Sequence, residues 1–124
     1  MFRFIHSIES FFKRYTYEHR CYHNVSHAGL LRASHALLKF CRDHGYSEGG
    51  LEHLTGCIAA LESDDFKAAV KHFREMHFGG MGRFDDWFPP VICEHEDGNY
   101  VWSVFEALLE RWIRLMRTAA GDLE

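Results

Sequence analysis

The sequence has few of the residues that divide a chain into separate parts. Its 124 residues contain only two prolines, and these are adjacent, at Pro89 and Pro90. No stretch has the composition of a linker, and the length suits one domain with a single core. Hydrophobic residues make up 47% of the chain and aromatic residues 15%, more than a disordered chain carries. We therefore expect residues 1–124 to form one folded domain.

Short motifs of common enzyme chemistry are also missing. The chain has no GxxxxGK(S/T) phosphate loop, no GxSxG nucleophile turn, no GxGxxG dinucleotide turn and no HExxH zinc motif. No nucleophile, base and orienting group can be paired from the sequence. We expect a non-enzymatic protein without a cofactor.

Long apolar runs and paired cysteines are absent as well. The N-terminal stretch MFRFIHSIESFFKR has charged or polar residues every two or three positions, and no stretch is long enough to span a bilayer. Cys21, Cys41, Cys57 and Cys93 are widely spaced and form no CxxC pair. Cys41 and Cys57 fall on apolar helical stripes, and free core thiols are typical of a reducing compartment. We expect a cytoplasmic protein with no membrane association.

Positive charge is scarce in the second half of the chain. Residues 1–45 hold seven Lys or Arg and three Asp or Glu, a net charge of +4, whereas residues 46–124 hold seven and fifteen, a net charge of −8. An acidic surface favours a basic protein partner and repels anionic membranes. The basic and aromatic stretch FFKRYTYEHRCY resembles a nucleic-acid groove, but the acidic balance of the whole chain disfavours that interpretation. We expect a basic protein partner and no nucleic acid.

Apolar residues at helical spacing account for most of the chain. The pattern predicts five helices, at about residues 2–22, 26–45, 50–62, 63–79 and 99–119. Ser26 and Ser63 are the expected N-caps of the second and fourth helices. Because the connections are short, we expect an all-α, single-domain bundle of about five mostly antiparallel helices.

The last predicted helix is apolar around most of its circumference. Its only continuous polar row consists of Ser103, Glu106, Glu110, Arg114 and Arg117. A helix with one narrow polar row is buried on several sides. We expect it either at the centre of the bundle or at the interface of a homodimer.

The stretch HFGGMGRFDDWFPP, residues 77–90, has no helical pattern. Its glycines can take positive φ angles, and its prolines force an extended exit. In one interpretation its aromatic residues pin a packed corner onto the bundle. In the other it is a recognition loop, acting together with the acidic EHED turn at residues 94–97. The contact residues of such a loop would be Gly80, Gly82, Arg83, Phe84, Asp85, Asp86 and Trp87.

The segments FGGMGRFDDWF and EDGNYVWSVFEALLERW resemble a motif of a family of small, uncharacterised bacterial all-helical proteins. In that family a GGMGSFNDL-like segment precedes a final helix opened by asparagine. The matching residues are Gly79, Gly80, Met81, Gly82, Phe84, Asp86 and Asn99. Arg83, Asp85 and Trp87 depart from the motif, and the resemblance covers about residues 66–117. Some similar proteins are immunity-type proteins, which bind and neutralise a partner protein, but the family has no settled activity. The resemblance implies a helical fold and a shared structural role for the glycine turn, and it carries over no catalytic residue. An immunity-like role is one function that it suggests.

Histidine, with ten residues, suggests an alternative function. His19, His23 and His27 are spaced four apart, and imidazoles one helical turn apart can bind a transition metal. A break around Asn24 argues against a continuous helical face. The CEHED segment, residues 93–97, also gathers a thiol, an imidazole and three carboxylates, a set suited to acid–base chemistry or a cation. The alternative is therefore a metal-binding enzyme or sensor.

Overall fold

The computed structural model describes residues 20–79 and 83–122 of the chain. Within these ranges the protein is mainly helical, which confirms the all-α prediction. Its elements are β1 (Cys21–Tyr22), β2 (Val25–Ser26), α2 (His27–Asp43), the 3-10 turn η1 (Glu48–Leu51), α3 (Glu52–Glu62), α4 (Phe66–Glu75) and α5 (Gly98–Ala119).

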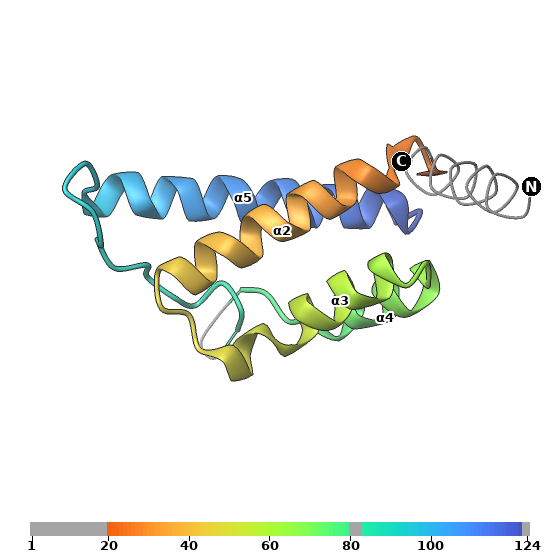
Figure 1. Ribbon diagram of the computed structural model, residues 1–124, viewed down its shortest axis with the longest axis horizontal. Coiled ribbons are helices and arrows are strands. Elements are labelled where there is room, and N and C mark those ends of the chain that lie inside the picture. The colour runs from red at the N-terminus through yellow and green to blue at the C-terminus, as the bar shows by residue number, and fades with distance from the viewer. Residues whose placement is uncertain (1–19, 80–82, 123–124) are drawn as a thin grey trace, which may run out of the picture.

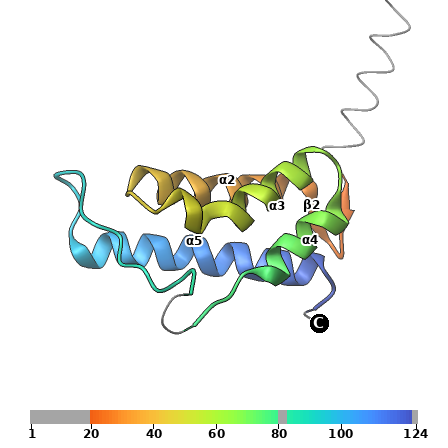
Figure 2. The same ribbon diagram turned by 90° about the horizontal axis from the view of Figure 1, so that it is seen from below.

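The four helices alternate in direction. α2 and α5 lie antiparallel along the length of the molecule, and α3 and α4 form a second antiparallel pair below them (Figure 1). Seen from below, α4 lies beside the C-terminal part of α5, where the rings of Phe73 and Trp112 meet edge to face at 5.3 Å (Figure 2). The predicted antiparallel arrangement therefore holds for these helices.

A small hairpin replaces the end of the first predicted helix. Residues 1–19 of that helix lie outside the described residues, but Cys21 pairs with Ser26 and Tyr22 with Val25 in an antiparallel ladder. The turn residues His23 and Asn24 have φ angles of 49° and 68°, as a two-residue hairpin turn requires. The prediction that the helix extends to Tyr22 is wrong, because the chain reverses at these two residues.

Helix starts follow side-chain caps, and two differ from the prediction. The Ser26 hydroxyl accepts a hydrogen bond from the Gly29 amide at 2.9 Å, so the predicted cap of α2 is confirmed. Asp65, and not Ser63, caps α4 by accepting from the Ala68 amide at 3.1 Å. Ser63 instead ends α3, because Asp64 takes a φ angle of 60° and reverses the chain between the two helices.

The start of α5 and the end of α4 are also earlier than predicted. Asp97 caps α5 by accepting from the Tyr100 amide at 2.8 Å, two residues before the expected opener Asn99. α4 ends at Glu75 because Met76 is extended, with a ψ angle of 147°. Gly79, the predicted end of this helix, therefore lies in the connection that follows.

The core lies where the inward stripes of the four helices meet. In η1 and α3 the apolar residues at helical spacing, Leu51, Leu54, Ile58 and Leu61, are all buried. At the centre of the core the Trp112 indole donates to the Ser34 hydroxyl at 2.9 Å, and that hydroxyl donates to the Leu30 carbonyl at 2.7 Å. The polar atoms of this buried pair are thus hydrogen-bonded, as burial requires.

The last helix buries one stripe. The buried residues are Val101, Phe105, Leu109, Trp112, Met116 and Ala119. The apolar residues on either side of this stripe, such as Leu108, Ile113 and Leu115, are only partly buried. Four helices packed in two pairs leave no central position, so within the described residues α5 does not occupy the centre of the bundle.

The four cysteines form no disulfide and lie in two different environments. Cys41 and Cys57 are buried, and burial raises the pKa of each thiol to about 12. Cys21 and Cys93 are exposed. Among the described helices, none has the length and apolar character needed to cross a membrane.

Candidate interaction surface

The connection between α4 and α5 begins as a packed corner, which we define as residues 83–87. Phe84 is only 7% exposed, and its ring packs on the rings of Tyr46 and Phe105 at 4.9 and 6.4 Å. Its amide donates to the His77 carbonyl at 2.9 Å, and its carbonyl accepts from the Tyr46 hydroxyl at 2.7 Å. Phe84 is therefore held by both its side chain and its backbone.

The Tyr46 hydroxyl is a stable donor in this corner. Burial, followed by the charges of neighbouring acidic groups, raises the pKa of Tyr46 to about 12. The hydroxyl therefore keeps its hydrogen, and its bond to the Phe84 carbonyl, throughout the neutral range.

Trp87 and Asp85 also hold the corner. The Trp87 ring lies edge-on to Tyr46 at 4.7 Å and to Phe105 at 5.1 Å. The Asp85 carboxylate accepts from the Gly79 amide at 2.7 Å, where Gly79 turns the chain with a φ angle of 77°. These contacts support the packed-corner interpretation.

The predicted contact residues consequently fall into four groups. Phe84 is buried and is not available to a partner, Asp85 and Trp87 are half-buried in the corner, and Arg83 and Asp86 are exposed. Gly80 and Gly82 lie outside the described residues.

The segment after the corner presents its apolar side chains to solvent. Phe88 is 78% exposed, and its ring stacks on the partly buried Trp102 at 4.8 Å. Val91, Ile92 and Tyr100 are each about half exposed. In the described residues, the exposed large hydrophobic side chains are these four, and we call them the 88–100 surface. The segment forms the loop at the end of the molecule where α5 begins (Figure 1).

A buried contact between His44 and Glu96 ties this loop to the end of α2. The Glu96 carboxylate accepts from the Ile92 and Cys93 amides at 2.9 and 3.1 Å and pairs with the His44 Nε2 atom at 2.9 Å. His44 Nδ1 lies 2.9 Å from the Phe40 carbonyl. The two side chains are only 7% and 6% exposed. We call these contacts the His44–Glu96 latch.

The latch joins His44 to two hydrogen-bond acceptors. The Phe40 carbonyl and the Glu96 carboxylate can only accept, so both bonds to His44 form when both ring nitrogens carry hydrogen. Hydrogen bonds from the Ile92 amide and from His44 lower the pKa of Glu96. The sequence placed Glu96 in an acidic turn, but its side chain points inward to a residue 52 positions earlier in the chain.

The surroundings of the 88–100 surface are acidic. Residues 83–106 contain one basic residue, Arg83, and six acidic ones, Asp85, Asp86, Glu94, Glu96, Asp97 and Glu106. Glu96 is used in the latch and Asp97 in the helix cap, whereas Glu94 and Glu106 are exposed. A partner would therefore meet apolar side chains beside negative charge.

The predicted histidine cluster does not form one helical face. His19 lies outside the described residues, His23 lies in the hairpin turn, and His27 is buried at the start of α2 with Nδ1 3.1 Å from the Tyr22 hydroxyl. Burial, and then the charge of Arg20, lowers the pKa of His27. In the described parts of the chain, no group of three or more His, Cys, Asp or Glu side chains could hold a metal ion.

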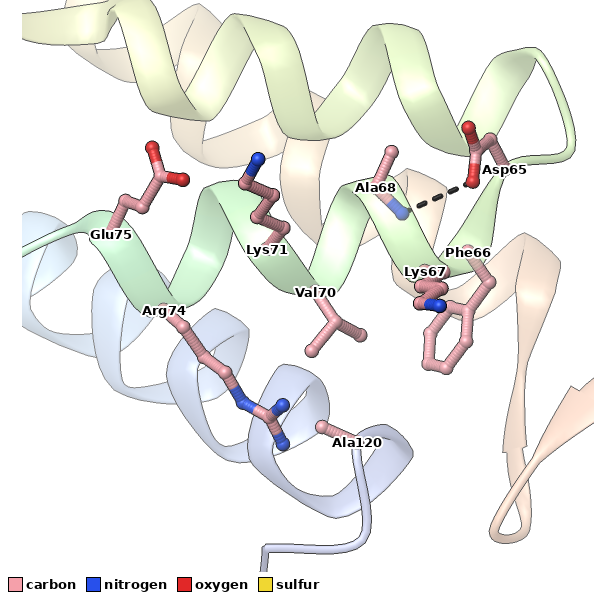
Figure 3. Close-up of a pocket in the computed structure, with 9 residues that line it drawn as sticks. All are labelled: Asp65, Phe66, Lys67, Ala68, Val70, Lys71, Arg74, Glu75 and Ala120. Atoms are coloured by element: carbon pink, nitrogen blue, oxygen red, sulfur yellow. Dashed lines mark hydrogen bonds between the residues drawn. The ribbon is translucent and has the colours of Figure 1, made fainter.

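A second surface feature is an open groove of about 720 Å³ along α4 (Figure 3). Its apolar floor is formed by Phe66, Val70 and Ala120, the last of which follows the end of α5. Lys67 and Lys71 flank it. Arg74 completes the basic row and pairs with Asp122 at 2.9 Å. Asp65 and Glu75 also line this groove, so both basic and acidic side chains border its apolar floor.

Comparison of the chain with family models, with curated proteins and with solved structures found no match.

Proposed function

We propose that this is a non-enzymatic interaction protein that binds a basic partner protein through the 88–100 surface. One observation carries the proposal: the exposed large hydrophobic side chains of the described residues all belong to one short segment. Exposed apolar groups bordered by polar residues are typical of protein interaction sites. Because the latch and the corner hold the segment from both sides, it would bind with little loss of conformational freedom.

Phe88 is the expected anchor of the contact. Its ring rests on Trp102 and leaves most of its surface to solvent, so a partner pocket would cover a large apolar area without unfolding the corner. Aromatic anchors of this kind provide much of the energy of protein interfaces. The exposed Glu94 and Glu106 favour basic residues at the edge of the partner site.

Within this class, we propose an immunity-like role in a bacterial cytoplasm, in which the protein binds and neutralises its partner. The support is the resemblance of the Gly79–Asp86 segment and the last helix to the family described above. In this segment Gly79 makes a turn with a φ angle of 77°, and its amide donates to the Asp85 carboxylate.

A homodimer through the same surface is less favourable. A two-fold contact would place the acidic surroundings of one 88–100 surface against those of the other, and like charges repel. Size-exclusion chromatography with light scattering separates the two arrangements, and a stable dimer that Phe88→Ser dissociates would replace our proposal.

The test is site-specific crosslinking. A photo-reactive phenylalanine analogue replaces Phe88 in one variant and Leu115, partly exposed further along α5, in the control. After irradiation in the host cell, we expect one dominant crosslinked protein of basic composition from position 88 and none from position 115. Equal products from the two positions, or none from position 88, would contradict the assigned surface.

A further inference from the structure

Most side chains of the 88–100 surface belong to one run of consecutive residues, Phe88, Pro89, Pro90, Val91 and Ile92, which we call the proline run. The Phe88 side chain is 78% exposed, and those of Val91 and Ile92 are each about half exposed. Pro89 is buried, whereas Pro90 is exposed, and the run forms neither helix nor strand. It therefore packs on the body through one proline ring and presents its other side chains to solvent.

The two prolines fix the backbone of this run. A proline ring fixes φ, and the residue before a proline is excluded from the helical region. Phe88 and Pro89 both precede a proline, so both are extended, and Pro89 takes the polyproline II conformation. This conformation has about three residues per turn, which places side chains three positions apart on the same edge. Phe88 and Val91 therefore form one apolar edge of the run.

The same prolines disfavour pairing of the run with a strand of the partner. Successive amides of an extended chain point to opposite edges, so each edge of the run contains one proline. Because proline has no N–H group, neither edge can donate a continuous row of hydrogen bonds. The carbonyl groups of the run can still accept. We therefore expect a partner to recognise its side chains and carbonyl groups, and not to form a hydrogen-bonded ladder with it.

We propose that the partner binds the proline run as a polyproline II ligand, in a groove lined by aromatic side chains. This inference rests on the proposed function, since it takes the 88–100 surface as the contact site. A proline-containing chain loses little conformational entropy in such a groove, because it is already stiff. Tyrosine and tryptophan side chains of the groove also supply the O–H and N–H donors that the carbonyl groups of the run can accept. The exposed Glu94 and Glu106 favour basic residues at the edge of the groove.

The experiment compares two substitutions of Val91 in the full chain. Val91→Pro and Val91→Ala both remove the exposed valine side chain, but only Val91→Pro removes the N–H group and extends the stiff run. The probe is the protein that crosslinks to position 88, expressed and purified, and calorimetry measures its Kd for each variant. We expect Val91→Pro to bind about two- to fivefold more tightly than Val91→Ala, because a stiffer run loses less entropy. Pro90→Ala, which loosens the run, should weaken binding by about the same factor.

Urea denaturation and amide protection at Ile92 are the folding controls, because the Ile92 amide bonds to Glu96 and reports a closed latch. If Val91→Pro opens the latch, Pro90→Ala decides. Binding about tenfold or more weaker in Val91→Pro than in Val91→Ala, with the latch closed, would indicate strand pairing and overturn this inference alone. Unchanged or tighter binding by Pro90→Ala would also overturn it. No crosslinked product from position 88, or a second copy of this chain as the product, would overturn the proposed function and this inference together.

Discussion

The corner and the 88–100 surface are consecutive in the sequence but use their aromatic side chains in opposite ways. Phe84 is 7% exposed and packs between Tyr46 and Phe105, whereas Phe88, four residues later, is 78% exposed. The difference comes from the neighbours that each residue meets. The Tyr46 ring packs on Phe84 and its hydroxyl donates to the Phe84 carbonyl, whereas the Phe88 ring stacks on Trp102 and stays exposed.

This difference shows how a short connection can be both rigid and available for binding. The corner is held by its buried aromatics and by hydrogen bonds to its backbone, and the loop after it is held by the latch. We therefore expect the exposed side chains between them to contribute little to the stability of the fold. Four predictions test this separation, in order of decreasing effect on the stability of the whole domain.

The largest effect is expected from truncating the corner aromatic. Phe84→Ala removes a buried ring and should lower the free energy of unfolding by about 3–5 kcal/mol, measured by urea denaturation. Phe88→Ala is the same substitution at an exposed position and serves as its control. If the two variants lose the same free energy of unfolding, the corner does not stabilise the fold more than the 88–100 surface does.

A smaller effect is expected when only the hydrogen bond to the corner is removed. Tyr46→Phe keeps the ring contacts with Phe84 and Trp87 but removes the donor to the Phe84 carbonyl. The free energy of unfolding should fall by about 1 kcal/mol. A loss as large as that of Phe84→Ala would show that the hydroxyl, and not the ring, is the main support.

Acid should loosen the latch before it unfolds the corner. The pKa of Glu96 is lowered in the folded protein, so its contribution to stability is complete above the ordinary glutamate value of 4.5 and is lost as the pH falls through the lower folded value. Amide hydrogen exchange measured below pH 4.5 should show lost protection at Ile92 and Cys93, which bond to the carboxylate.

The Phe84 amide is the internal control for that measurement. It bonds to the His77 carbonyl, which does not titrate, so its protection should persist. Simultaneous loss of protection at Phe84 and Ile92 would mean that the two segments open as one unit.

The smallest effect on stability is expected from changing the exposed side chains. The double variant Phe88→Ser and Ile92→Ser should change the free energy of unfolding by no more than about 0.5 kcal/mol per site, because both side chains are exposed. The same variant should abolish partner binding, which pull-down from the host cell measures. Destabilisation on the scale of Phe84→Ala would show that the 88–100 surface is part of the core.

The helical periodicity of the sequence correctly predicted the buried faces of the helices. The stripe of Leu51, Leu54, Ile58 and Leu61 is buried as expected, since each turn of a helix repeats the same environment. Caps were less predictable, because Ser63 and Asp65 are both good N-cap residues and the positive φ angle of Asp64 decided between them.

The candidate sites depend on contacts that periodicity does not contain. Which of Phe84 and Phe88 faces inward is decided by Tyr46, which lies 38 residues before Phe84. The latch joins residues 52 positions apart in the chain.

Alkylation of the two buried thiols can be used to measure opening of the core. Cys41 and Cys57 come from different helices, and neither sulfur can meet an alkylating reagent until the core separates. The alkylation rate of Cys41 therefore reports opening of the core at α2, and that of Cys57 reports opening at α3. The exposed Cys21 and Cys93 can react in the folded molecule. Alkylation of the exposed thiols thus gives the reference rate, and alkylation of the buried thiols measures opening of the core.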